Sequence, residues 1–80
     1  MPSVLIIDGY RFYFYANEGN EPAHIHVYYN KAVAKFWLEP VVLAKNLGMT
    51  AGELSKASRL TKENSKFLKE KWDEFRSKKT

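Results

Sequence analysis

The chain has 80 residues, no cysteine and a formal net charge of +4, and 45% of its residues are hydrophobic. This length predicts one domain, and the hydrophobic content argues against disorder. The lack of cysteine excludes disulfides and thiolate metal sites. No apolar run approaches the roughly 20 residues of a membrane span, and the first residues lack the basic region of a signal peptide. We therefore expect a cytoplasmic protein without a membrane segment.

The first half of the chain has the composition and alternation of β-strands. Two turns divide it: Asp8-Gly9 suits a two-residue hairpin, and Asn30-Lys31 can form a second tight turn. The Asn, Gly and Pro content between the second and third apolar segments predicts a loop. Four strands are predicted: residues 3–7, 10–15, 24–29 and 32–38.

The fourth strand is interrupted by Glu39-Pro40, because proline cannot donate a hydrogen bond to a neighbouring strand. Residues 41–43 can resume the sheet as a short fifth strand. Downstream of this point the hydrophobic pattern loses its period of two, so the sheet is expected to end here.

From Thr50 onward the apolar residues recur at three- and four-residue steps, which predicts a helix. Thr50 and Glu53 have the spacing of a capping box. One amphipathic helix over about residues 51–75 is predicted. The alternative is a break near Leu60-Thr61, since Thr61 can cap a second helix.

The predicted fold is α+β, an antiparallel meander of four to five strands with one long C-terminal amphipathic helix packed on one face. The helix is expected on the phenylalanine side of the strands. The predicted core joins Phe12, Phe14, Ile25, Val27, Phe36 and Leu38 to Leu54, Leu60, Phe67, Leu68 and Trp72.

The opposite face of the predicted sheet is unusually aromatic and contains both histidines. Such a patch usually marks a binding surface. A protein partner or self-association is preferred, because aromatic content exceeds charge there. Base stacking by nucleic acid is an alternative, although the ribonucleoprotein signature is absent. The residues expected on this face are Arg11, Tyr13, Tyr15, His24, His26, Tyr28, Lys35 and Trp37.

The two histidines, His24 and His26, are themselves candidate catalytic or metal-binding residues. Residues i and i+2 of a strand point the same way, about 6.6 Å apart, so both imidazoles can reach one divalent metal. Glu18 or Glu21 would have to complete the site. The same histidines can serve acid–base chemistry in a hydrolase or nuclease, with Glu21 as the orienting carboxylate. The structural alternative is that they stack among tyrosines and bond to loop backbone.

The excess of positive charge lies in the second half of the chain, since residues 1–39 contain three basic and four acidic residues. Cations near the end of a helix complement its dipole. The basic residues on the helix are diluted by glutamates, which is typical of a solvated face. The charge therefore does not by itself predict nucleic-acid binding.

Several segments together carry a resemblance to a known family. These are Pro2-x-Val4-Leu5-x-x-x-Gly9-Tyr10-Arg11-Phe12, Glu21-Pro22-x-His24-Ile25-His26-Val27, Ala34-Lys35-Phe36, Asn64 and Trp72. The pattern resembles the domain of unknown function 4160 family of small bacterial proteins. The Pro-x-His-x-His segment is the most specific part, although Ala23 stands where the family usually has a second proline.

The resemblance implies a compact bacterial α+β domain without established biochemistry, and it makes His24 and His26 the positions to test. It also implies an association with toxin–antitoxin-like gene neighbourhoods. The expected function is an accessory or regulatory protein acting by protein contact, in its specific form as part of a toxin–antitoxin pair. A histidine-dependent enzyme or a metal-binding protein is the alternative, and a divalent metal is the one cofactor that the pattern suggests.

Overall fold

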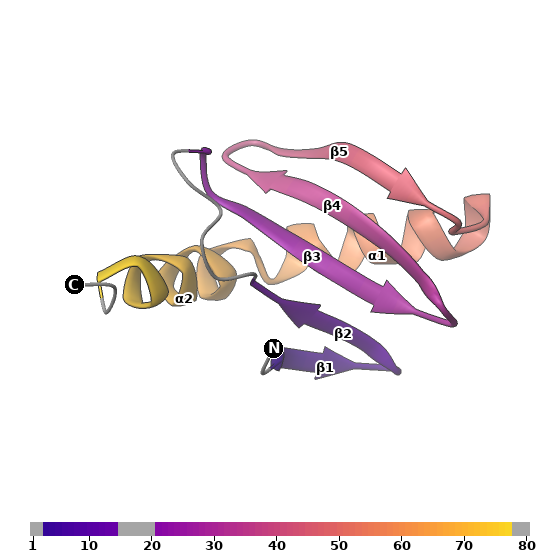
Figure 1. The fold of residues 1–80 in the computed structure, drawn as a ribbon, viewed down its shortest axis with the longest axis horizontal. Helices are drawn as coiled ribbons and strands as arrows, with labels where there is room; N and C mark the ends of the chain where they lie inside the picture. Colours follow the sequence, from indigo (N-terminus) through magenta and orange to yellow (C-terminus); the bar gives the residue numbers. More distant parts are fainter. Residues whose placement is uncertain (1–2, 15–20, 78–80) are drawn as a thin grey trace.

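The structure, a computed structural model, describes residues 3–14 and 21–77 (Figure 1). Five antiparallel strands form one sheet in which every strand lies beside its neighbours in sequence. The predicted α+β meander is therefore confirmed, with the optional fifth strand present and longer than residues 41–43. The strands are β1 (Ser3–Ile7), β2 (Tyr10–Tyr13), β3 (His24–Tyr29), β4 (Ala32–Leu38) and β5 (Val41–Leu47).

Two hairpin turns set the register of the sheet. Asp8 and Gly9 have φ of 51° and 84°, and Asn30 and Lys31 have φ of 52° and 66°. Positive φ at both central residues matches the right-handed twist of the flanking strands. Because a slip of one residue would turn every side chain to the other face, these turns decide which residues share a side of the sheet.

The helical half consists of two helices, α1 (Ala51–Glu63) and α2 (Ser65–Ser77), so the single helix over residues 51–75 is corrected. The boundary is Asn64, whose φ of −113° and ψ of 17° depart from helical values. Its side-chain amide donates to the Leu60 carbonyl oxygen at 2.8 Å, a local bond that competes with regular helix.

The alternative of two shorter helices is therefore confirmed, but the break lies at Asn64 and not at Leu60-Thr61. The Thr61 hydroxyl does not cap a helix; it donates to the Ala57 carbonyl oxygen at 2.7 Å inside α1. At the true boundary, the backbone bonds still run across the junction, from Asn64 N–H to Leu60 and from Leu68 N–H to Asn64. The two helices therefore follow one another with little change of direction (Figure 1).

The start of α1 is the predicted capping box. The Thr50 hydroxyl accepts the Glu53 N–H at 3.1 Å, and the Glu53 carboxylate accepts the Thr50 N–H at 3.0 Å. Two donors that a helix leaves unpaired at its first turn are thus satisfied reciprocally.

Both helices pack on the phenylalanine side of the sheet, as predicted, and the core lies between them and the strands. Phe67 is the exception among the predicted core residues: it lies at the margin of the buried stripe of α2 and is 37% exposed, with the Lys71 ammonium over its ring. No helix among the described residues is long and apolar enough to cross a membrane. The buried core includes Phe12, Phe14, Ile25, Val27, Phe36, Leu38, Ala57, Leu60, Leu68 and Trp72.

Candidate functional site

The side of the sheet that the helices leave uncovered is the candidate site, and we call it the outer face. Its residues form rows of direct neighbours across the strands. One row runs from Tyr13 through His26 and Lys35 to Lys45. The neighbouring rows place Ile6, Arg11, Tyr28, Val33 and Leu47 on one side and His24, Trp37 and Val42 on the other.

The two histidines are on this side of the strands but are not presented to solvent. His24 is 0% exposed and His26 is 7% exposed. The ring of His24 lies 4.9 Å from that of Trp72, because α2 lies at the end of the sheet where β2 ends and β3 begins (Figure 1). His26 stacks on Tyr13 at 5.5 Å between ring centroids. The expectation that both imidazoles are open to ligands is therefore corrected.

Local hydrogen bonding fixes the ring of His24. Its Nδ1 lies 2.9 Å from the Pro22 carbonyl oxygen. A carbonyl oxygen can only accept, so Nδ1 carries the proton and Nε2 has the lone pair in the neutral ring. The next carbonyl, that of Ala23, accepts the Leu38 N–H at 3.0 Å and holds this segment against β4. The backbone before β3 thus orients the imidazole.

Glu21, a proposed ligand or orienting carboxylate, has a different partner. Its Oε1 lies 2.6 Å from the Lys35 ammonium and 3.8 Å from His24 Nδ1. Glu18 and Tyr15, the other predicted members of the site, lie outside the described residues. Within residues 3–14 and 21–77, no group of three His, Cys, Asp or Glu side chains could hold a metal ion.

The aromatic rings of the outer face are partly engaged within the domain. The Lys35 ammonium lies 4.8 Å from the Trp37 ring centroid, and His24 meets the same indole edge-on at 5.8 Å. Tyr13 is stacked on His26. Among the described rings of this face, Tyr28 has the largest exposed fraction, 39%. In its described part the face therefore presents one exposed tyrosine and several aliphatic side chains rather than a row of exposed rings.

The charge of the outer face has one sign. The five strands contain three basic residues, Arg11, Lys35 and Lys45, and no acidic residue. The strand register places all three on the outer face. Glu21, from the segment before β3, is the carboxylate that the structure places against one of them.

The outer face has a small hollow across β3, β4 and β5, which we call the outer pocket. It encloses about 260 Å³. Aliphatic side chains and lysines form its walls, so it combines apolar and cationic character. Its lining residues are His26, Val33, Lys35, Lys45 and Leu47.

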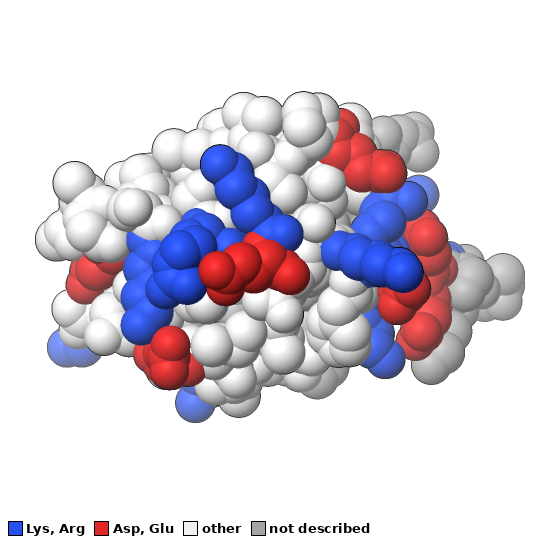
Figure 2. Space-filling model, turned by 180° about the vertical axis from the view of Figure 1, so that it is seen from behind, with Lys and Arg blue, Asp and Glu red and all other residues white. Residues whose placement is uncertain are grey.

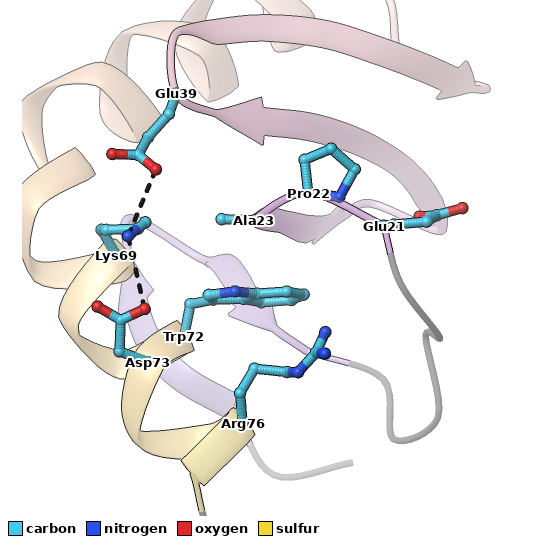
Figure 3. A pocket seen from close by; sticks show the side chains of 8 residues that line it. All are labelled: Glu21, Pro22, Ala23, Glu39, Lys69, Trp72, Asp73 and Arg76. Carbon is cyan, nitrogen blue, oxygen red and sulfur yellow. Dashed lines mark hydrogen bonds and ion pairs between the residues drawn. The ribbon is translucent and has the colours of Figure 1, made fainter.

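A second, more open hollow of about 680 Å³, the end groove, lies beside α2 (Figure 3). In it the Lys69 ammonium bridges the carboxylates of Glu39 at 3.3 Å and Asp73 at 3.5 Å. The hydrogen bond to Glu39 raises the pKa of Lys69. These contacts tie α2 to the β4–β5 turn. The groove is lined by Glu21, Pro22, Ala23, Glu39, Lys69, Trp72, Asp73 and Arg76.

Comparison with known families agrees with the resemblance seen in the sequence. The family model described as "Domain of unknown function (DUF4160)" matches residues 9–73, a span that includes β2 to β5, α1 and most of α2. The chain belongs to the DUF4160 family. No curated protein and no solved structure shows significant similarity to it. The function of this DUF4160 domain therefore has to be inferred from its own surface.

The helical side of the DUF4160 domain is a less favourable binding surface. Figure 2 shows Lys and Arg side chains interleaved there with Asp and Glu. Several are paired, such as Arg59 with Glu63 at 3.1 Å and Lys71 with Glu74 at 3.4 Å. Mixed, paired charges are typical of a solvated helix face. This supports the interpretation that the basic residues of the helices are not a nucleic-acid site.

Sequence reasoning missed part of the outer face. Lys45 and Leu47 lie beyond the predicted fifth strand, which ends at residue 43, and Val42 lies within that strand but is not among the residues predicted for this face. Residues 43–47 show no alternation of apolar and polar side chains, so the one sequence signal for a longer strand is Gly48, a residue typical of a strand end, which has positive φ in the structure. The residues of the end groove, which depend on where α2 lies, had no such signal.

Proposed function

We propose that this DUF4160 domain is an accessory or regulatory protein that binds another protein through its outer face. The main evidence is that the helices cover one side of the sheet and leave apolar side chains on the other side exposed to solvent. Ile6, Val42 and Leu47 are 59%, 50% and 54% exposed, and Tyr28 adds an aromatic ring. Exposed apolar and aromatic side chains that share one face of a sheet are typical of an interaction surface.

The charge of the outer face supports an acidic partner. Arg11, Lys35 and Lys45 give it positive charge, and no strand contributes a carboxylate. Two copies of the chain, each with a net charge of +4, would bring like charges together if they paired through this face. An acidic protein surface complements it in charge and is attracted during encounter.

A nucleic acid is a weaker match to the same face. Proteins that depend on phosphate contacts commonly make about 6–10 of them, whereas this face has three cations, one of which is paired with Glu21. Stacking of successive bases needs several exposed rings, and of the described rings Tyr28 is exposed whereas Tyr13 and Trp37 contact His26 and Lys35. The aliphatic side chains favour a protein.

In its specific form the proposal places the domain in a bacterial toxin–antitoxin pair, with the acidic partner as the other member. The family resemblance noted in the sequence supports this form. The general proposal, binding to an acidic protein, rests on the outer face and does not depend on that setting.

The proposal is tested by capturing partners of the tagged chain from its own cells and measuring their affinity for purified variants. Tyr28→Ser combined with Leu47→Ser should weaken binding at least about tenfold, because both side chains are exposed on the outer face. The control is Phe67→Ser, which removes from the helical side an apolar side chain about as exposed as Tyr28 (37% against 39%). Circular dichroism verifies that each variant is folded.

A partner that binds the Tyr28, Leu47 variant normally but loses the Phe67 variant would contradict the proposal. So would a captured nucleic acid whose binding requires the outer face. Sedimentation tests self-association instead. A stable dimer of the chain alone that the outer-face substitutions dissociate would mean that the face binds a second copy and not an acidic partner.

Metal binding through the histidines is a second candidate function, and one observation favours it. The bond from His24 Nδ1–H to the Pro22 carbonyl leaves Nε2 as the nitrogen with the lone pair, the arrangement common in metal-binding histidines. The imidazole centroids of His24 and His26 are 5.3 Å apart. Catalysis on a large substrate is less favoured, because both rings are buried.

Titration of zinc into the metal-free chain, followed by NMR of the imidazole signals, tests this candidate. We expect saturable shifts of both rings with one metal bound per chain if the site forms. His24→Gln and His26→Gln should each abolish zinc uptake. Glu21→Gln should weaken zinc binding if Glu21 is a ligand, and should leave it unchanged if Glu21 only pairs with Lys35. Unchanged imidazole signals up to about millimolar zinc would exclude a site of useful affinity.

A further inference from the structure

We propose that the acidic partner binds as an extended segment that adds a sixth strand beside β5, with a carboxylate at Lys45. This inference rests on the proposed function and specifies how the outer face would be used. The added strand would pair with the edge strand β5, and it would be an acidic segment of the partner with a high tendency to form β-structure.

The first observation is that β5 is a long and uncovered edge of the sheet. It pairs with β4 on one side and is the last strand in the sheet order. All its residues after Val41 are exposed, and Val42, Leu43 and Leu47 are apolar. An edge strand presents backbone N–H and C=O groups to any strand that can approach it.

The second observation is the chemistry beside that edge. Lys45 and Leu47 are two residues apart, point to the same face and line the outer pocket. A strand paired with β5 places residues directly opposite them, also two apart. An acidic residue opposite Lys45 and an apolar residue opposite Leu47 would therefore match both positions.

The third observation is an imbalance of charge at Lys45. It is the direct cross-strand neighbour of Lys35, and like charges in that position repel. Lys35 is paired with Glu21, whereas Lys45 forms no ion pair with any residue in the described part of the chain. A carboxylate from the partner supplies the missing counter-charge.

The register of β5 locates the contact more narrowly. The pairing of β4 with β5 is irregular between Lys35 and Phe36, where Ala44 is the extra residue on β5. A bulge of this kind bends an edge strand. The regular ladder is therefore expected along Lys45–Leu47, the half of β5 that lines the outer pocket.

The other edge of the sheet does not offer the same site. β1 has no basic residue, and Asp8 follows it directly. An acidic segment would meet a carboxylate there. A second copy of the chain is also a poor occupant of β5, since two β5 edges would bring the two Lys45 side chains into one short ladder.

The test uses a capped synthetic peptide, Thr-Thr-Val-Thr-Glu-Thr-Thr, added to the isotope-labelled chain and followed by backbone NMR. In an antiparallel pairing with β5, this order places the Val opposite Leu47 when the Glu is opposite Lys45. Shifts are expected at residues 41–47 and at the lining of the outer pocket. The Lys45→Glu variant should bind this peptide about fivefold more weakly and should prefer the peptide with Lys in place of Glu. A peptide with N-methylated backbone should not bind, because it cannot form the ladder.

Absence of shifts at millimolar peptide, equal binding of the Glu and Lys peptides, or binding of the N-methylated peptide would overturn the inference. A β5-dependent dimer in sedimentation would overturn it as well. The proposed function is judged separately by the Tyr28, Leu47 double variant. A natural partner could lose affinity for that variant while its binding leaves hydrogen exchange at residues 41–47 of the parent chain unchanged. This result would support binding through the outer face and contradict the added strand.

Discussion

Trp72 connects three segments that are distant in the sequence. Its ring contacts Phe14, which follows β2, at 5.5 Å, and His24, which begins β3, at 4.9 Å. The Arg76 guanidinium lies 5.4 Å from the same indole on α2. The side chain is 6% exposed, so its surface is used almost entirely in these contacts. It holds α2 against the end of the sheet.

Trp72→Ala should therefore lower the free energy of unfolding by about 3–5 kcal/mol, the usual cost of removing a buried aromatic side chain. Urea denaturation followed by circular dichroism measures this. Phe67→Ala, on the same helix but 37% exposed, is the control and should cost less than about 1 kcal/mol. Equal losses for the two variants would mean that the packing of α2 on the sheet is misassigned.

The histidines show which residue-level properties a sequence reveals. The alternation around His24 and His26 correctly predicts that both follow the side of β3 away from the helices. It cannot predict their burial, because the cover comes from Trp72, 48 positions after His24, and from a tyrosine on the neighbouring strand. The structural alternative considered for them, stacking with aromatic rings and bonding to loop backbone, matches the observed contacts.

The capping box of α1 makes a prediction at the level of the element. The bond that Glu53 accepts from the Thr50 backbone N–H, with a second from Asn30, holds the pKa of this carboxyl below its ordinary value of 4.5. A depressed pKa means that the ionised form stabilises the fold. This stabilisation is fully present above the unfolded-state pKa and is lost as the pH falls through the folded-state pKa.

Glu53→Gln should accordingly have a lower melting temperature than the parent at neutral pH, and the difference should shrink as the pH falls below about 4. Thermal unfolding followed by circular dichroism across this range measures it. Glu70→Gln removes the same charge from an exposed position of α2 and is the matched control. A difference between Glu53→Gln and the parent that stays constant down to about pH 2 would mean that the carboxylate is not held by the cap.

The elements themselves were predicted where a local signal exists. Asp8-Gly9, Asn30-Lys31 and the Thr50 capping box mark turns and a helix start by their own backbone chemistry. A division into two helices is the alternative that the sequence offers, but its position at Asn64 has no sequence signal, because the apolar period and the backbone bonding both continue through it. One asparagine side chain bonding back to Leu60 makes the difference.

The whole molecule separates its charges between two sides. Among charged Lys, Arg, Asp and Glu residues, the strands contribute only basic ones to the outer face, whereas the acidic residues of the described chain lie in turns, in helices and, for Glu21, in the segment before β3. The helical side carries both signs (Figure 2). This arrangement follows from the strand register and could be predicted once the turns were placed, although the length of β5 and hence Lys45 could not. Because the outer face is positively charged, the charge of a candidate partner decides whether it fits this face, in addition to the area that it would bury.

The strictly sequential order of the strands has a consequence for the chain while it is being made. All five strands are complete at Leu47, and the helices that cover Phe12, Val27 and Phe36 follow them. At ribosomal rates of about 5–20 residues per second, the ribosome finishes α2 roughly 2–6 s after the sheet. Until the helices are made, the apolar side of the strands lacks the cover that it has in the folded domain.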